Sequence, residues 1–373
     1  MNKRELAEVK KHFHTDDGLF TVGGVATAYI NAEKKIKGCT VRNFIEIPED
    51  EGSLLFNIAK RTLSGSIGKN LVEYAFPREQ YESGGVQELL YGILKDKSLT
   101  GDYIDSLLPL TAASLHMEST YAVLVMHCTY SVISKSKDDR SLDMNDLDYN
   151  FFIVSFIPVA MPEKELIFDG EAIIKREDLI LTLSDKPSDG FLFPVFSDRA
   201  PDVNSVLVYS KNAAKPNISL VTELLGCEFV RNPKSEREVF NEVLKTAVGD
   251  ELDYTKIIQI DEMIASYIAE NQNETELPTV DAPRIARMLS EAGVSESARA
   301  ALPAAFEKAA GETPLLAVNL VSSKVNLQTE GITVSITGDS AGKLRTVNQN
   351  GRKCLIIDLD DPTVIVNGIE TTV

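Results

Sequence analysis

Two long apolar segments near the middle of the chain constrain its fold more than any other feature. They read TYAVLVMHCTYSV (residues 120–132) and NFFIVSFIPVA (residues 150–160). Strands that are apolar almost throughout are typical of a sheet that is covered on both faces. The polar segment between them, SKSKDDRSLDMNDLD (residues 134–148), predicts an exposed loop. We therefore expect two central strands that are antiparallel neighbours in one sheet.

The remaining patterns predict an α+β fold with a mainly antiparallel central sheet. Short apolar runs and period-two alternation indicate strands at residues 19–30, 39–47, 190–196 and 203–211. Helical spacing of apolar residues indicates helices at 1–14, 51–63, 85–96, 102–114, 218–226, 235–248 and 254–271. Residues 314–373 read as strands only, and Asn350-Gly351 and Asn367-Gly368 predict tight hairpins.

These elements predict four parts along the chain. An α+β body covers residues 1–270, and a polar, proline-bounded linker covers 271–282. A helical pair follows at 283–311, and a small all-β domain, barrel-like or a simple sheet, covers 312–373. The length of 373 residues is consistent with two or three domains.

Net charge disfavours contact with nucleic acid over most of the surface. The chain carries a formal charge of −18, yet residues 1–80 hold 12 Lys and Arg against 11 Asp and Glu. Nucleic acid would be repelled by the strongly acidic remainder. Any basic face must therefore lie in the N-terminal part, and we expect its residues to be Lys3, Arg4, Lys10, Lys11, Lys34, Lys35, Lys37, Lys60, Arg61 and Lys69.

Cysteine usage and hydropathy indicate a cytoplasmic protein. The four cysteines are far apart and form no CxxC pair, which is typical of reduced thiols. The first 13 residues are too charged for the apolar core of a signal peptide. No apolar run approaches the roughly 18 residues that span a membrane, so we predict no membrane association.

The segment LSGSIGKN (residues 63–70) has some features of a phosphate-binding loop. That loop requires GxxxxGK[ST] between a strand and a helix. Here Leu63 stands where the first glycine is needed, and Asn70 replaces the hydroxyl residue. The preceding segment also reads as a helix. We interpret the segment as a helix end at which Gly65 and Gly68 let the backbone turn.

No metal or cofactor site is predicted. The four histidines show no zinc-ligand spacing, and His127 and Cys128 would point to opposite faces of a strand. The acidic segment DDRSLDMNDLD (residues 138–148) lacks the glycine and the bidentate glutamate of a calcium-binding EF-hand loop. No GxGxxG or GxSxG motif occurs where dinucleotide binding or serine nucleophiles need it.

One loop is the best candidate for a ligand or partner site. Pro194 requires its strand to be an edge strand or to kink, and Asp198, Arg199 and Asp202 follow it. Two carboxylates around an arginine would hold it in place for an anionic ligand. The alternative interpretation is a turn closed by Asp and Arg side chains that bond nearby groups.

Several segments together resemble a bacterial family catalogued as domain of unknown function 4317. They are the N-terminal MNKRELAEVKKHF, LSGSIGKNLVEYAFP, GFLFPVFSDRAPDVNSVLVYSKN, ELLGCE and NGRKCLIIDLDDPTVIVNGIE. The resemblance covers essentially the whole chain and implies a cytoplasmic bacterial protein, with no activity or cofactor to transfer. Residues 189–248 also resemble part of the 37-kilodalton nucleoid-associated proteins, whose members associate with DNA.

Three classes of function remain open. The first is a non-enzymatic binding or assembly protein with an unidentified protein partner. The second is a nucleic-acid-associated protein that uses the N-terminal basic residues. The third is an enzyme in which Asp198, Arg199 and Asp202 meet His127 or Cys128 in the fold. The oligomeric state stays open.

Overall fold

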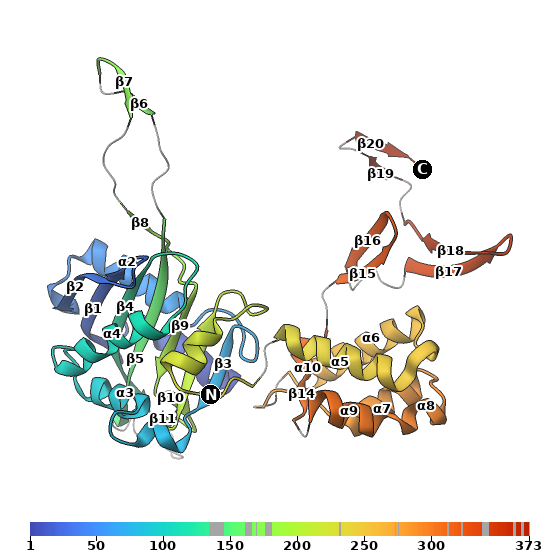
Figure 1. Cartoon of the computed structure of the whole chain (residues 1–373), viewed down its shortest axis with the longest axis horizontal. Helices are drawn as coiled ribbons and strands as arrows, with labels where there is room; N and C mark the ends of the chain where they lie inside the picture. Colours follow the sequence, from blue (N-terminus) through green and yellow to red (C-terminus); the bar gives the residue numbers. More distant parts are fainter. Residues whose placement is uncertain are drawn as a thin grey trace, which may run out of the picture. The chain divides into compact units, whose positions relative to one another are not determined.

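The computed structural model describes the chain except for residues 134–144, 161–165, 169, 176–180, 231–232, 273, 275, 312, 322–323, 338–342, 361–362, 367–368 and 373. Residue contacts divide the chain into two compact units (Figure 1). The first comprises Met1–Glu238 and Asn273–Leu277, and the second comprises Val239–Gln272 and Pro278–Val373.

The first unit is built on a sheet that contains eight of the described strands. Its order is β2-β1-β4-β5-β9-β12-β3, with β8 paired to β5, and neighbouring strands run antiparallel. The strands are β1 (Phe20–Ile30), β2 (Ile36–Asn43), β3 (Leu71–Ala75), β4 (Tyr121–Ile133), β5 (Asn145–Ala160), β8 (Thr182–Leu183), β9 (Asp189–Phe193) and β12 (Ser205–Ser210).

The two apolar segments form adjacent central strands, as predicted. β4 and β5 pair antiparallel from Tyr121↔Pro158 to Ile133↔Asn145. β5 begins at Asn145, so the last four residues of the predicted loop are strand. These residues extend the pairing of β4 with β5, since Asp148 pairs with Ser131 and Leu147 pairs with Val132. The rest of that loop, and with it most of the acidic segment weighed for calcium, lies outside the described residues.

Helices cover both faces of the sheet, which explains the continuous apolar character of its strands. On one face, the core holds Leu6 of α1 and Phe56 of α2. On the other face, the core holds Leu90 of α3, Leu107 of α4 and Leu220 of η3. These elements are α1 (Lys3–His12), α2 (Glu49–Arg61), α3 (Val86–Lys95), α4 (Asp102–Ser114) and the π-helical η3 (Leu220–Leu224), with short 3₁₀ turns η1 (Phe44–Glu46) and η2 (Arg78–Tyr81).

Two sequence interpretations in this unit are settled by the fold. The segment LSGSIGKN leads from helix α2 into strand β3, the reverse of a phosphate loop, and Gly65 and Gly68 have φ of 86° and 80°. Pro194 marks a kink: β9 lies inside the sheet between β5 and β12, and the chain turns at Pro194 into β10 (Val195–Ser197). β10 pairs with β11 (Ala200–Asp202) in a separate hairpin.

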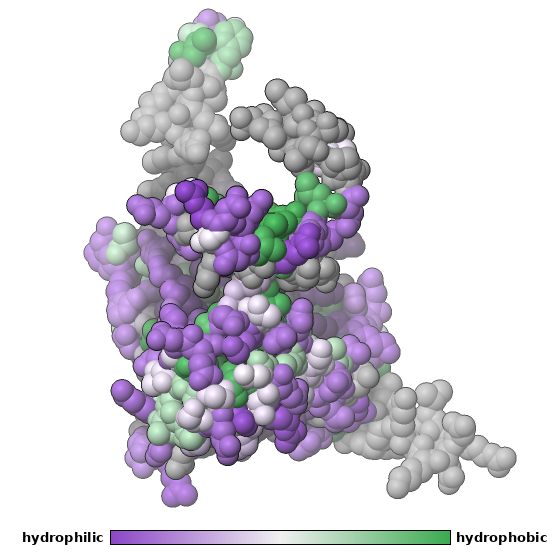
Figure 2. All heavy atoms as spheres, turned by 90° about the vertical axis from the view of Figure 1, so that its right-hand side faces the viewer, coloured by the Kyte–Doolittle hydropathy of each residue, from purple (hydrophilic) through white to green (hydrophobic). Residues whose placement is uncertain are grey.

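A further hairpin in the first unit carries exposed apolar side chains. It consists of β6 (Leu166–Phe168) and β7 (Ile173–Lys175), a sheet of two described strands. Phe168 lies directly opposite Ile173, and their exposed fractions are 70% and 72%. Figure 2 shows green side chains at the surface of this hairpin, at the top of the view.

The second unit has a helical core. Phe240, Ile260, Leu302 and Leu320 are among the residues buried in it. The elements are α5 (Pro233–Val248), η4 (Gly249–Glu251), α6 (Tyr254–Glu270), β13 (Thr279–Val280), α7 (Ala282–Glu291), α8 (Glu296–Ala300), α9 (Leu302–Ala310), β14 (Leu315–Leu316) and α10 (Ala317–Leu320).

This core crosses the domain boundaries that the sequence suggests. Residues expected in the α+β body, such as Phe240, and residues expected in the β-domain, such as Leu315, pack in one cluster with α7 and α9. Residues 314–373 are also not all strand, since Ala317–Leu320 is a short helix with a buried face. Whether residues 1–270, 283–311 and 312–373 fold separately stays a prediction.

The chain ends in successive hairpins. β15 (Lys324–Thr329) pairs with β16 (Ile332–Thr337), β17 (Leu344–Gln349) with β18 (Arg352–Ile357), and β19 (Thr363–Val366) with β20 (Ile369–Thr372). The turn at Asn350-Gly351 is confirmed, whereas Asn367-Gly368 lies outside the described residues. Among the described strands these are separate two-stranded sheets, not one barrel-like sheet.

The structure confirms the predicted α+β class with a large antiparallel sheet, helices in the middle of the chain and small C-terminal sheets. None of the described helices is long and apolar enough to cross a lipid bilayer.

Candidate functional site

Asp198 and Arg199 form the tip of the β10–β11 hairpin. Ser197 pairs with Ala200, so these two residues make the whole turn, and their φ angles are 50° and 59°. Positive φ at both central residues is the requirement of a type I′ hairpin turn, and it is costly for side chains other than Gly, Asn and Asp. Contacts to the rest of the first unit must therefore hold Arg199 in this conformation.

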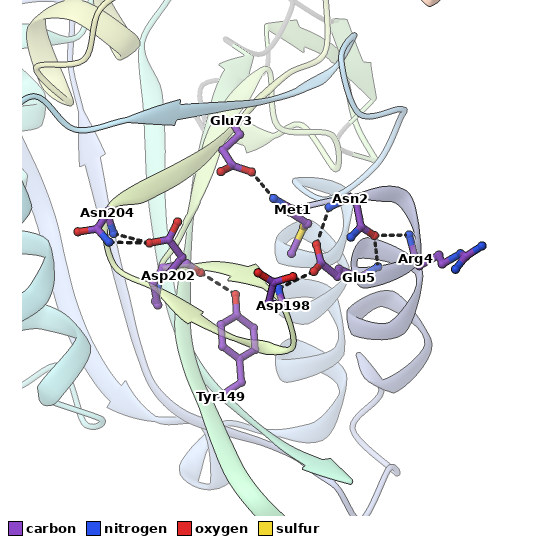
Figure 3. A network of polar contacts seen from close by, with 10 residues as sticks. Met1, Asn2, Arg4, Glu5, Glu73, Tyr149, Asp198, Asp202 and Asn204 are labelled. Carbon is purple, nitrogen blue, oxygen red and sulfur yellow. Dashed lines mark hydrogen bonds and ion pairs between the residues drawn. The ribbon is translucent and has the colours of Figure 1, made fainter. Parts of the chain in front are cut away.

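Asp198 is held through its backbone, by helix α1. Its N–H donates to Glu5 Oε1 at 2.7 Å, while the other oxygen of Glu5 accepts the N–H of Asn2 at 2.6 Å. Asn2 in turn caps the helix by accepting from the N–H groups of Arg4 and Glu5 (Figure 3). The buried Glu5 carboxylate thus completes a capping box and receives the hairpin tip at the same time.

Arg199 is paired with a carboxylate that the sequence did not suggest. Its Nη2 lies 3.0 Å from Glu8 Oε1 on α1, and the same oxygen accepts the hydroxyl of Tyr130 on β4 at 3.0 Å. Burial, and then the bond to Glu8, raise the pKa of Tyr130. Tyr130 is therefore a neutral donor, and it shares Glu8 with the arginine.

His12 extends this network. Its ring stacks on Tyr130 with centroids 4.9 Å apart, and its Nδ1 lies 2.9 Å from Asp17 Oδ2. The N–H of Leu19 donates to Asp17 at 2.9 Å and is the main cause that lowers the pKa of Asp17, with His12 adding to it. An imidazole oriented by a carboxylate is an arrangement that general bases use. Among the described residues, however, no hydroxyl or thiol hydrogen-bonds to His12.

Asp202 closes its own turn. Its Oδ1 accepts the backbone N–H of Asn204 at 2.9 Å and the side-chain amide of Asn204 at 3.0 Å (Figure 3). Nearby, the hydroxyl of Tyr149 donates to the carbonyl of Pro194 at 2.6 Å and fixes the kink. These contacts are those expected of a turn that is closed by local hydrogen bonds.

The residues suggested for an enzyme do not converge. Cys128 is fully buried in the α1–α2 core, and burial raises its pKa well above that of a free thiol, which is typical of an unreactive cysteine. His127 lies on the opposite face of β4, where its Nε2 is 3.0 Å from the carbonyl of Leu94. Asp198 contacts α1 instead, on the Cys128 face. The sheet therefore separates His127 from the hairpin tip.

The residues suggested for a basic face differ in surroundings. Burial lowers the pKa of Lys10, and Arg61 forms an ion pair with Asp185. Lys34 donates to the carbonyl of Ala113 on α4, on the sheet face opposite α1. Arg4 and Lys11 are exposed, while Lys3, Lys60 and Lys69 are partly buried. Whether any of them binds nucleic acid stays a prediction.

A small cavity in the first unit lies beside Asp189. It has a volume of about 20 Å³, and Lys69, Asn70, Ser210 and Asn217 are among its lining residues. Burial raises the pKa of Asp189, and this effect exceeds that of the hydrogen bond from the Ser210 hydroxyl at 3.0 Å, which lowers the pKa. A space of this size accommodates about one water molecule, not a small-molecule ligand.

Metal binding finds no support in the described part of the chain. There, no three His, Cys, Asp or Glu side chains are grouped so that they could hold an ion. Of the described cysteines, Cys128 and Cys227 are buried, Cys354 is partly buried and Cys39 is exposed.

A comparison with known protein families gives a match over nearly the whole chain. A family model described as Domain of unknown function (DUF4317) covers residues 1–369. The chain belongs to this family. No curated protein matches the chain. The DUF4317 assignment agrees with the family resemblance seen in the sequence, and it brings no activity with it. The likeness to nucleoid-associated proteins stays a prediction.

Proposed function

We propose that this DUF4317 protein is a non-enzymatic binding or assembly protein, and that its partner binds the C-terminal hairpin region, residues 324–372. The observation that carries the proposal is the exposure of large aliphatic side chains in these hairpins. Exposed fractions are 60% for Ile332, 42% for Leu355 and 47% for Ile357, and Leu359, just after β18, is 51% exposed. Figure 2, seen from the side on which β17 and β18 lie in Figure 1, shows green residues among purple ones at the surface.

The pairing of the strands supports the same conclusion. An isolated two-stranded hairpin is marginally stable in water and normally needs further strands or a packed face. Each described C-terminal hairpin pairs only within itself. The outer edges of β15–β18 can therefore accept a strand, and the aliphatic side chains offer apolar surface to whatever binds.

The first unit lends indirect support. The Asp198–Arg199 tip is engaged with α1, and Cys128 is inert, so the groups that the sequence offered for catalysis serve packing and turn formation. The β6–β7 hairpin is a second exposed apolar feature of the described chain, where Phe168 lies opposite Ile173.

The experiment is affinity capture from a native bacterial lysate with three baits. The baits are the full chain, residues 1–321, and the full chain with Ile332→Thr, Leu355→Thr and Ile357→Thr. Truncation after Val321 keeps Leu315, Ala317 and Leu320, which are buried in the core of the second unit. We expect a protein partner with the full chain and its loss with the other two baits.

The matched control changes exposed apolar residues elsewhere. A Phe168→Thr, Ile173→Thr chain should retain the partner, because it removes a similar area outside the hairpin region. The capture is repeated with a nuclease-treated lysate. Proteins that reach the bait only through bound nucleic acid are then lost, whereas direct protein partners are retained. Retention of the same partners by residues 1–321, or capture that nuclease abolishes, would contradict the proposal.

A further inference from the structure

The first two C-terminal hairpins have the same two-residue turn geometry. In β15–β16, Thr329 pairs with Ile332 around Glu330-Gly331, and in β17–β18, Gln349 pairs with Arg352 around Asn350-Gly351. Gly331 and Gly351 have φ of 77° and 76°, so glycine serves the same turn position in both. In β19–β20, Val366 pairs with Ile369.

The first of these hairpins has one apolar and one polar face. Leu327 lies opposite Val334. Ile332 and Ile336 are two residues before and after Val334 on β16, so their side chains lie on the same face as that of Val334. Gln328, Thr333 and Ser335 occupy the other face. A two-stranded ribbon with one apolar face corresponds to half of a sandwich in which two sheets pack face to face. The complementary half needs a similar apolar face.

Charge favours a second copy over a partner of opposite charge. Residues 322–373 contain five Lys and Arg and six Asp and Glu, so this part is nearly neutral in a chain of net charge −18. Within it, Lys343 pairs with Asp360, and Arg345 Nη2 lies 2.8 Å from Asp358 Oδ1. The acidic remainder of two copies repels, and the neutral hairpin region is where two copies can approach.

Resting on the proposed function, we propose that the partner of the hairpin region is the hairpin region of a second copy of this chain. The apolar faces of equivalent hairpins pack against each other, and the outer edges of β15–β18, which have no neighbouring strand among the described residues, extend from one copy to the next. An interface of this kind uses the same surface on both copies, which is the usual arrangement in a symmetric dimer.

The test is the molar mass of the purified full chain, measured by light scattering over a range of concentrations. One chain has a mass of 41.0 kDa. We expect the mass to rise with concentration to about twice this value for the full chain. Residues 1–321 and the Ile332→Thr, Leu355→Thr, Ile357→Thr chain should keep the mass of one copy at the same concentrations.

A control variant on the polar face guards against general damage to the hairpin. Gln328→Thr with Ser335→Thr preserves strand-forming residues and the apolar face, so its mass should follow that of the unchanged protein. The near-ultraviolet circular dichroism spectrum of every variant is compared with that of the unchanged protein. Equal spectra verify that the cores around the central sheet and the helical core of the second unit remain folded.

The outcomes separate this inference from the proposed function. A full chain that stays monomeric while lysate capture still finds a hairpin-dependent protein overturns the second-copy inference and leaves the proposed function standing. Association of residues 1–321 to the same extent as the full chain also overturns it. If neither mass nor capture depends on the hairpin region, both proposals fail.

Discussion

His127 shows how burial alone can determine the behaviour of one residue. Its side chain is fully buried on β4, Nε2 lies within hydrogen-bond distance of the carbonyl of Leu94, and Nδ1 has no hydrogen-bond partner among the described residues. Burial is the main cause that lowers the pKa of His127 below its ordinary value of 6.5, with Lys97 contributing. The folded state therefore holds the neutral imidazole where the unfolded state already binds a proton.

This difference predicts a loss of stability in acid. As the pH falls below 6.5, His127 becomes protonated in the unfolded chain but stays neutral in the folded protein. Because the unfolded state then binds more protons, the free energy of unfolding decreases. The contribution reaches at most about 1.4 kcal/mol per pH unit. Denaturant unfolding of His127→Gln between pH 7 and pH 5 should show a shallower slope than the unchanged protein. His116→Gln, at an exposed position, is the control, and equal slopes in all three would refute the prediction.

Sequence reasoning placed Asp198 and Arg199 in a turn, as the structure has them, but could not identify the side chains they contact. A turn with Asp198 and Arg199 follows from Pro194 and the polar residues after it. Glu8 and Tyr130 belong to segments more than a hundred residues apart, and they meet only because α1 packs on the β4 side of the sheet. The i, i+3 spacing of Glu5 and Glu8 on α1 was visible, yet it is ordinary for a helix surface.

At the scale of the element, the β10–β11 hairpin depends on α1 for its position. Glu5 accepts from the N–H groups of both Asn2 and Asp198. Removing a carboxylate that serves two partly buried donors leaves both without a partner, which costs about 1–3 kcal/mol. We expect Glu5→Ala to lower the free energy of unfolding by that amount, measured with urea, and Glu5→Gln to recover only part of it, because its single amide oxygen replaces one of the two carboxylate acceptors.

If Glu5→Ala proves neutral, the hairpin tip is not held by α1, and the interpretation of Asp198 and Arg199 as a ligand site becomes the better one. Asp198→Asn tests the side chain separately. Asn keeps the backbone N–H and adopts positive φ readily, so stability should stay within about 0.5 kcal/mol.

Long elements were predictable from sequence and short ones were not. β4 and β5 were recognised because residues 120–132 and 150–160 are almost continuously apolar. β3 was missed because its five residues, LVEYA, follow a turn and resemble the end of a helix. α10 was read as strand because its four residues, AVNL, are too few to show a helical period, and the helix is recognised only from its packing against α6.

At the scale of the molecule, the chain combines well-packed cores with a C-terminal hairpin region whose described residues belong to none of these core clusters. The cores around the central sheet and the helices hold the large buried side chains. In the described hairpin region, Leu344 is buried, but Ile332, Leu355 and Ile357 are not. Sequence alone predicted the strands here, because period-two patterns are local. It did not predict that the hairpins stay separate, because sheet assembly depends on long-range pairing.

The most direct test of the central claim, that the hairpin region completes its structure by binding, is amide hydrogen exchange of residues 324–372 at low and high protein concentration. Isolated hairpins open readily and exchange fast, whereas paired strands are protected. The account predicts that protection of β15–β18 increases with concentration while that of β4 and β5 stays the same. Protection of β15–β18 that is equally strong at every concentration would contradict it, because the hairpins would then be complete within a single chain.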